Sequence, residues 1–311
     1  MSSHSRRLFF KQGAALFGAT LLAHKTDAAT ALVKGMQHIE ADKELLLYHS
    51  HNLQELAATG SLAELKSLLD IEPGYGLLLD TGGLFPLSKG TALSGNMLDA
   101  INSLRLKASL LGSEFLCFAP EDLSGMLSKL DFPLVNCNYE FKNSRLNADV
   151  VPYVIYKTKM KTIGITGVGK MSSSAAVNVQ DPIDAANRMA AYLKKQKSCD
   201  IVICLTESEM NKQFAQESAD IDFVLGASDT AKIKQATVVN NSQKSEVILS
   251  NASQEFVAKS VILFNEDGQR IGFDHRHLMC SDPYARNAAV WAKIKLLQSE
   301  GTVSDTQRIL G

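Results

Sequence analysis

Short, uninterrupted apolar runs alternate along this chain with segments of helical periodicity. Residues 77–79 and 201–205 contain no polar side chain, which is typical of strands that are buried on both faces of a sheet. Residues 53–69 instead repeat leucine and alanine at intervals of three and four, as an amphipathic helix does. This alternation predicts an α/β protein in which helices cover both faces of a mixed sheet.

The same two patterns locate the other elements. We expect strands at 45–48, 75–79, 108–111, 133–136, 201–205 and 223–225, and helices at 53–69, 91–106 and 121–130. One hairpin is predicted around 157–161, and another at 265–268, where Asp267-Gly268 favours a tight turn. Asp181-Pro182 and Asp282-Pro283 each place a capping aspartate before a proline, which predicts helices reaching about residue 196 and about residue 298.

The N-terminus has the features of a twin-arginine export signal. Arg6 and Arg7 are adjacent, and an aromatic pair and a lysine follow them. An apolar stretch at 13–23 is too short to span a bilayer, and the small residues at 29–31 suit a signal peptidase. We therefore expect residues 1–31 to be the signal and the protein to be periplasmic or exported. If the signal is not cleaved, we expect it to attach the protein to the membrane.

The charge balance excludes one class of partner. The whole chain has 32 basic and 33 acidic residues. Residues 1–31 contain four of the basic and one of the acidic residues, so 28 basic and 32 acidic residues remain, a net charge of −4. Nucleic-acid binders usually present a basic face, and we therefore expect no nucleic-acid partner.

The glycine-rich segment 164–170 matches most of a phosphate-binding loop. Met171 stands where a serine or threonine hydroxyl should hold magnesium. A phosphate-binding loop also runs directly into a helix, whereas the next helix start here is Asp181. We interpret the segment as a glycine-rich strand end.

Several short motifs follow one another between residues 45 and 273. They read H-S-H-N-L-Q at 49–54, L-L-L-D-T-G-G at 77–83, L-L-G-S-E at 110–114, F-P-L-V-N-C-N at 132–138, L-T-E at 205–207 and L-G-A-S-D at 225–229. In order and spacing they resemble the motifs of the N-terminal metallophosphoesterase domain of the 5′-nucleotidase family, a branch of the calcineurin-like phosphoesterases. The resemblance implies an α/β, four-layer-type metallophosphoesterase sandwich of mixed β-sheets flanked by helices. It places this domain at 32–281, followed by a C-terminal helix and tail at 282–311.

The residues that would carry the chemistry of that family have changed. In the family, two metal ions polarise the phosphate and generate the attacking hydroxide. The resemblance implies that the metal-ligand positions are degenerate, and that Glu114 replaces the histidine that assists the leaving group. The changed ligand positions are Asn52, Gln54, Gly83, Ser113, Glu207, Ala227 and Asp229. Because a catalytic metal needs about three protein ligands in fixed geometry, we expect neither a dinuclear centre nor a catalytic residue.

Two smaller hypotheses concern the same region. Glu114, Glu207 and Asp229 form an acidic set whose oxygens suit one calcium or magnesium ion, although we expect a solvated polar cleft without a cofactor. His49 and His51 fall on one face of the first strand, out of register with Asn52. We expect both to be exposed or hydrogen-bonded histidines.

These observations favour an exported, non-catalytic metallophosphoesterase-like protein, a pseudoenzyme that acts as a binding or partner protein. The resemblance leaves two alternatives open: a phosphoric ester hydrolase with atypical ligands or new chemistry on the acidic residues, and a membrane-tethered structural subunit. The family's nucleotidases continue into a second domain that grips the nucleoside. We therefore expect a protein partner of unknown identity, with the last helix as a candidate docking element.

Overall fold

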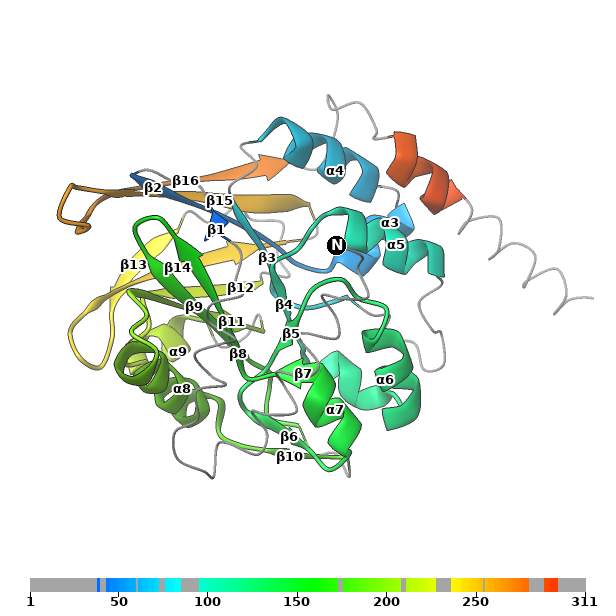
Figure 1. Cartoon of the computed structure of the whole chain (residues 1–311), viewed down its shortest axis with the longest axis horizontal. Helices are drawn as coiled ribbons and strands as arrows, with labels where there is room; N and C mark the ends of the chain where they lie inside the picture. Colours follow the sequence, from blue (N-terminus) through cyan, green and yellow to red (C-terminus); the bar gives the residue numbers. More distant parts are fainter. Residues whose placement is uncertain are drawn as a thin grey trace, which may run out of the picture.

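Two seven-stranded sheets form the centre of the molecule (Figure 1). The computed structural model describes residues 38–39, 43–59, 61–72, 76–84, 95–172, 176–207, 211–227, 236–253, 255–279 and 288–295. None of the helices in this part of the chain is long and apolar enough to cross a membrane.

The first sheet contains most of the motif-bearing strands. Its order is β16 (Arg270–Met279), β15 (Phe256–Phe264), β2 (Glu44–Ser50), β3 (Leu77–Asp80), β4 (Ala108–Leu110), β5 (Leu134–Val135) and β7 (Val150–Val151). Strands β2, β3, β4, β5 and β7 are parallel to one another, and β15 is antiparallel to both β2 and β16. The carboxyl ends of the parallel strands therefore meet at one edge of the sheet.

The second sheet has a parallel centre and antiparallel hairpins. Its order is β1 (His38–Ile39), β8 (Tyr153–Thr158), β9 (Thr162–Val168), β11 (Ile201–Thr206), β12 (Phe223–Ala227), β14 (Glu246–Ala252) and β13 (Thr237–Asn240). A separate two-stranded sheet pairs β6 (Tyr139–Phe141) with β10 (Val177–Val179). Strands β9, β11, β12 and β14 are parallel to one another.

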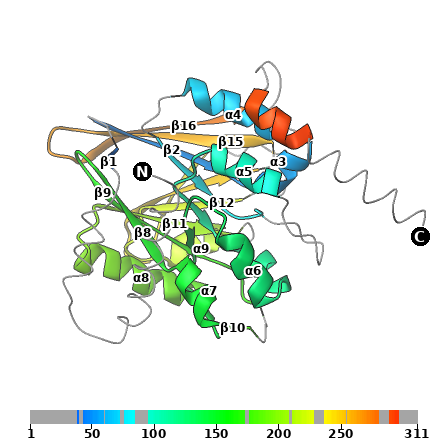
Figure 2. The same cartoon turned by 45° about the vertical axis from the view of Figure 1, so that its right-hand side comes forward.

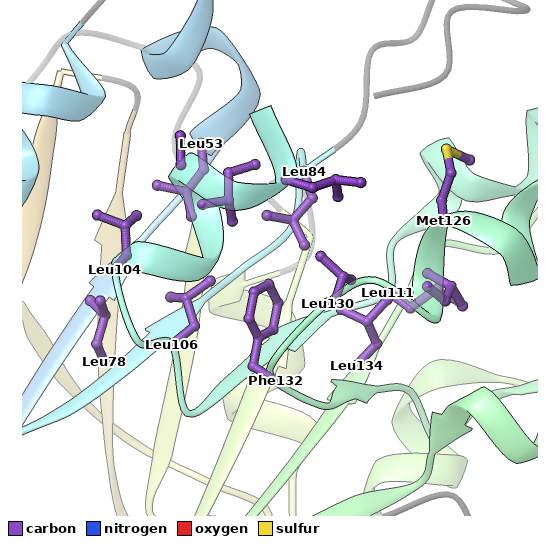
Figure 3. Close-up of a cluster of buried hydrophobic side chains, with 14 of the residues drawn as sticks. Leu53, Leu78, Leu84, Leu104, Leu106, Leu111, Met126, Leu130, Phe132 and Leu134 are labelled. Atoms are coloured by element: carbon purple, nitrogen blue, oxygen red, sulfur yellow. The ribbon is translucent and has the colours of Figure 1, made fainter. Parts of the chain in front are cut away.

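Helices cover the outer face of each sheet (Figures 1 and 2). They are α3 (Leu53–Thr59), α4 (Leu62–Ile71), α5 (Gly95–Ser103), α6 (Pro120–Leu127), α7 (Ser144–Asp149), α8 (Pro182–Gln196) and α9 (Asn211–Glu217), with a 3₁₀ helix η1 (Ser113–Cys117). One core packs the first sheet against its helices (Figure 3), a second lies between the sheets, and a third lies beneath α8 and α9. The predicted four-layer α/β sandwich is confirmed.

Local sequence signals explain several boundaries. Asp181 accepts a hydrogen bond from the backbone N–H of Asp184, and Pro182 occupies the first turn of α8, as the capping pattern predicts. The hairpin of β8 and β9 is confirmed. In the turn between β15 and β16, Gly268 adopts a φ of +73° and its N–H donates to the carbonyl of Asn265.

The glycines of the false phosphate-binding loop serve packing. A Cβ on Gly164 would lie 3.0 Å from Cδ1 of Leu193, and a Cβ on Gly167 would lie 2.7 Å from Cδ1 of Leu110. The next element among the described residues is the strand β10, not a helix. The interpretation as a glycine-rich strand end is confirmed.

One predicted helix differs from the structure, and the bounds of another lie outside the described residues. The single helix expected at 53–69 is wrong, since α3 and α4 are separate. The sequence between them, Gly60-Ser61, consists of weak helix formers. The last helix is seen at 288–295, while its expected start at Asp282 lies outside the described residues. Its Val290 and Ile294 are buried in the core of the first sheet, so its apolar face already packs within the chain.

Candidate functional site

The loops after β2 and β3 meet through their backbones. The N–H of Asn52 donates to the carbonyl of Gly82 at 2.9 Å, and the N–H of Gln54 donates to that of Gly83 at 3.3 Å. Asn52 has a φ of 58°, and Gly82 and Gly83 have φ values of 105° and 77°. Asparagine and glycine are the residues that adopt this left-handed conformation most readily, so the sequence suits the loops it forms.

The conformation at Gly83 leaves no space for a side chain. A Cβ at this position would lie 2.8 Å from the Cα of Asn52 and 3.1 Å from its Cβ. Gly83 is the position at which the resembling family has its metal-bridging aspartate. The structure therefore lacks both the carboxylate and the room for one.

Glu114 closes the other side of this loop. It lies in η1, directly after β4, and its Oε1 accepts a hydrogen bond from the N–H of Gly83 at 2.9 Å. Although Glu114 as a whole is partly exposed, its carboxylate points inward, since a Cβ on Gly112 would collide with it. That same Cβ would collide with the carboxylate of Glu207. The two carboxylates thus flank one small volume above Gly112.

Glu207 links the two sheets at this point. It follows β11 of the second sheet and is 7% exposed. One carboxylate oxygen accepts from the backbone N–H of Ser113, and the other accepts from the backbone N–H of Lys170 at 2.7 Å. Ser113 follows β4 of the first sheet, whereas Lys170 follows β9 of the second. The carboxylate therefore accepts one hydrogen bond from each sheet and joins the two sheets at this point.

Electrostatics at the site favour a neutral Glu114. Burial, and then repulsion by Glu207, raise its pKa to about 7. Nearby, Asp80 accepts hydrogen bonds from Ser109 Oγ, Ser50 Oγ and the N–H of Gly82 at 2.8–3.0 Å. Burial still raises the pKa of Asp80 to about 7. Burial thus disfavours the ionised form of both carboxyl groups.

The structure brings most of the predicted site residues together. Asn52, Gly83 and Glu114 are in direct contact, and Ser113 and Glu207 adjoin them through Gly112. Gln54 joins by its backbone alone, and Ala227 ends β12, beside β11. The remaining predicted residues, Asp229 and the signal arginines Arg6 and Arg7, lie outside the described residues.

These residues do not fit a dinuclear metal centre. Gly83 cannot carry a bridging group, and the carboxylates of Glu114 and Glu207 already accept backbone N–H groups. Within the described residues, no three His, Cys, Asp or Glu side chains form a group that could hold a metal ion. The single calcium or magnesium ion stays a hypothesis, because Asp229, the third member of its acidic set, is not described.

Four histidines lie near one another here, and one of them, His49, differs from the sequence-based expectation. His49 is completely buried, and neither ring nitrogen makes a hydrogen bond of good geometry, although the backbone of Gly226 approaches the ring. The prediction of an exposed or hydrogen-bonded His49 is therefore wrong, because its strand face lies between the two sheets. His51 is partly buried, with Nδ1 3.4 Å from Thr81 Oγ1. His275 and His277 were missed, although their spacing of two on a strand would place them on one face.

Both the sequence and the fold of this chain are similar to those of known phosphoesterases. No family model matches the chain. The trifunctional nucleotide phosphoesterase YfkN of Bacillus subtilis is 27% identical over 46% of this chain, which corresponds to 12% of that relative. The 5′-nucleotidase precursor of Thermus thermophilus superposes with a TM-score of 0.69 at 17% identity, covering 82% of this chain and 59% of that structure. The calcineurin-like phosphoesterase YfkN structure from Bacillus subtilis gives a TM-score of 0.62 at 17% identity, covering 84% and 98%.

The chain thus spans little of the curated relative's length and somewhat more than half of the Thermus structure. At these identities the structural likeness establishes the fold. The resemblance drawn from the sequence motifs is confirmed: this chain has the metallophosphoesterase fold of the N-terminal domain of 5′-nucleotidases and calcineurin-like phosphoesterases.

Proposed function

We propose that this protein is an exported, non-catalytic relative of the metallophosphoesterases that acts as a binding or partner protein. One observation carries the non-catalytic part of the proposal. The N–H of Gly83, at the family's bridging position, donates to Glu114, and the space for a side chain at Gly83 is taken by Asn52. Two-metal hydrolysis requires two ions that stabilise the attacking and the leaving oxygen. At Gly83 there is no side chain that could bridge them.

A phosphoesterase assay tests this proposal. The purified protein is incubated with an aryl phosphate monoester and a diester, each with Mg²⁺, Mn²⁺, Ca²⁺ or Zn²⁺, beside YfkN of Bacillus subtilis as the positive control. We expect no turnover above the metal-only blank. Turnover that is lost in Glu114→Gln would overturn the proposal, because it would assign the reaction to this site.

A second candidate function rests on the carboxylate pair. General acid–base catalysis commonly uses two neighbouring carboxyl groups, one of which has a pKa near 7. An enzyme built on this pair would use Glu114 as the acid and would need no metal. A metal-independent rate with a bell-shaped pH profile, abolished in Glu114→Gln, would favour it over the binding protein.

Export and partnership are tested separately. Fractionation with N-terminal sequencing should find the protein outside the cytoplasm, and it should lack Arg6 and Arg7 if the signal is cleaved. Retention of both arginines in a membrane fraction would favour the tethered subunit. Chemical crosslinking in intact cells followed by purification from the periplasm should capture a partner protein. Recovery of uncrosslinked monomer alone, from correctly exported protein, would contradict the partner role.

A further inference from the structure

Two imidazoles on β16 converge by their Nε2 atoms. His275 and His277 lie two residues apart on one face of the strand, and their Nε2 atoms are 3.4 Å apart. That distance is long for an N–H···N hydrogen bond. It is close to the separation, about 3.3–3.4 Å, of two nitrogens bound to one tetrahedral metal at about 2.0–2.1 Å. The pair therefore has the spacing of two ligands of one ion.

Each of the two rings has a further hydrogen-bond partner. Nδ1 of His275 lies 3.1 Å from Oγ of Ser260 on the neighbouring strand. Burial lowers the pKa of His277, and a hydrogen bond with the backbone of Asn251 partly offsets that effect. Metal-binding histidines are commonly held in this way, with one nitrogen anchored to an outer group and the other free for the ion.

The third imidazole, that of His49, lies on the other side of β15 from His277. In the register of the first sheet, His49 of β2 and His277 of β16 both pair with Ala258 of β15. The three residues share one sheet face, and the methyl group of Ala258 leaves the space between the two rings unfilled by a longer side chain. His49 is completely buried and neither of its ring nitrogens makes a hydrogen bond of good geometry. A buried polar ring without such a bond is costly, and a bound cation would offset that cost.

We infer that His275 and His277 form a binding site for a borderline divalent cation of the Zn²⁺, Ni²⁺ or Cu²⁺ class, with His49 available as a third imidazole. Imidazole nitrogen is the ligand that these ions prefer, whereas Ca²⁺ and Mg²⁺ prefer oxygen. As the side chains stand, the described residues contain no group of three ready to hold an ion. A bound ion therefore completes its coordination shell with water, or with the His49 imidazole after that ring has rotated.

The surroundings suit entry and binding of a cation. His275 and His277 are only partly buried, so an ion can reach them from solvent. A neutral imidazole is the form that ligates a metal ion, and the partly buried position of the pair keeps its nitrogens next to one another. The proposed ligands do not include Glu114 or Glu207, so metal binding here does not depend on whether the protein is catalytic.

Zinc titration of the metal-free full-length protein tests the inference. We expect about one Zn²⁺ per chain by calorimetry, and Co²⁺ in its place should give visible absorption bands of a nitrogen-coordinated ion. The double variant His275→Gln/His277→Gln should weaken zinc binding by more than about 100-fold. Ser260→Ala, which removes only the outer hydrogen bond to His275, should weaken it by about 10-fold.

His51→Gln is the matched control, because it removes a neighbouring imidazole whose Nδ1 lies 3.4 Å from Thr81 Oγ1 and which is not one of the proposed ligands, and its zinc affinity should equal that of the unchanged protein. Far-UV circular dichroism checks that each variant is folded. If the double variant does not fold, Ser260→Ala decides. The inference is overturned if the unchanged protein binds no Zn²⁺, or if a folded double variant or Ser260→Ala binds it with unchanged affinity.

Discussion

The Cα of Asn52 lies 2.8 Å from the point that a Cβ on Gly83 would occupy. Both residues have a left-handed backbone conformation, and the loops that carry them are joined by hydrogen bonds between their main chains. This close approach means that the loss of the bridging aspartate is built into the backbone. A single substitution cannot restore the carboxylate without moving the loop.

Gly83→Asp should therefore destabilise the protein without giving it activity. An aspartate at a φ of 77° in contact with Asn52 should lower the free energy of unfolding by about 2 kcal/mol or more. Urea denaturation measures this. The control is Asn52→Asp, which restores another family residue at a conformation aspartate tolerates and should change stability little. A Gly83→Asp protein as stable as the original, with metal-dependent turnover, would contradict this account of the loop.

Glu114→Gln should stabilise the protein at alkaline but not at acidic pH. The folded pKa of Glu114 is about 7, raised from 4.5, so folding disfavours its ionised form. Below about pH 4.5 both states hold the proton and the group has no effect on stability. As the pH rises from 4.5 to 7, the unfolded chain ionises first and the folded state loses stability, up to a limit of about 3 kcal/mol. The Glu114→Gln substitution removes the ionisable group and therefore abolishes this loss of stability.

Measuring the free energy of unfolding of Glu114→Gln at pH 5 and at pH 8 tests the direction of this pH dependence. The gain over the original protein should be larger at pH 8, by about 1–3 kcal/mol. Glu140→Gln, which removes an exposed carboxylate on β6, should show little difference between the two conditions. A gain that is equal at both pH values would show that the carboxyl group of Glu114 is not held neutral by the fold.

Glu207→Ala should loosen the junction between the two sheets. Its carboxylate accepts the N–H of Ser113 from one sheet and that of Lys170 from the other. Removing it leaves two backbone donors without their acceptor, which costs about 1–3 kcal/mol each when they stay buried. Glu207→Gln keeps one carbonyl acceptor and should cost less. Hydrogen exchange at Ser113 and Lys170 should accelerate in the alanine variant, and unchanged exchange at both would argue against the link.

Calcium or magnesium should not bind at the acidic site. The carboxylate oxygens of Glu207 are both engaged with backbone N–H groups, and Glu114 is held near neutrality. Calorimetric titration with Ca²⁺ and with Mg²⁺ at pH 7 should therefore give only the heat of dilution. A saturable heat that disappears in Glu207→Gln would establish the hard-cation hypothesis instead.

Local patterns predicted much of the fold because they report on burial and capping directly. The apolar run of β11 is buried at every position, and Asp181-Pro182 starts α8 where its cap is expected. The break between α3 and α4 was missed because the leucine periodicity continues across it. Periodicity records which face is buried, and it does not record whether the helix axis is continuous.

The sequence by itself determined the class of fold and the order of the motifs, because these depend on residue identity and short-range spacing. Only the tertiary structure decided what fills the site. The contact of Asn52 with Gly83 and the meeting of Glu114 with Glu207 join residues from separate strands and from both sheets. The burial of His49 and the convergence of His275 with His277 depend on which sheet face turns inward. Such contacts arise from how the sheets pack, and no local pattern contains that information.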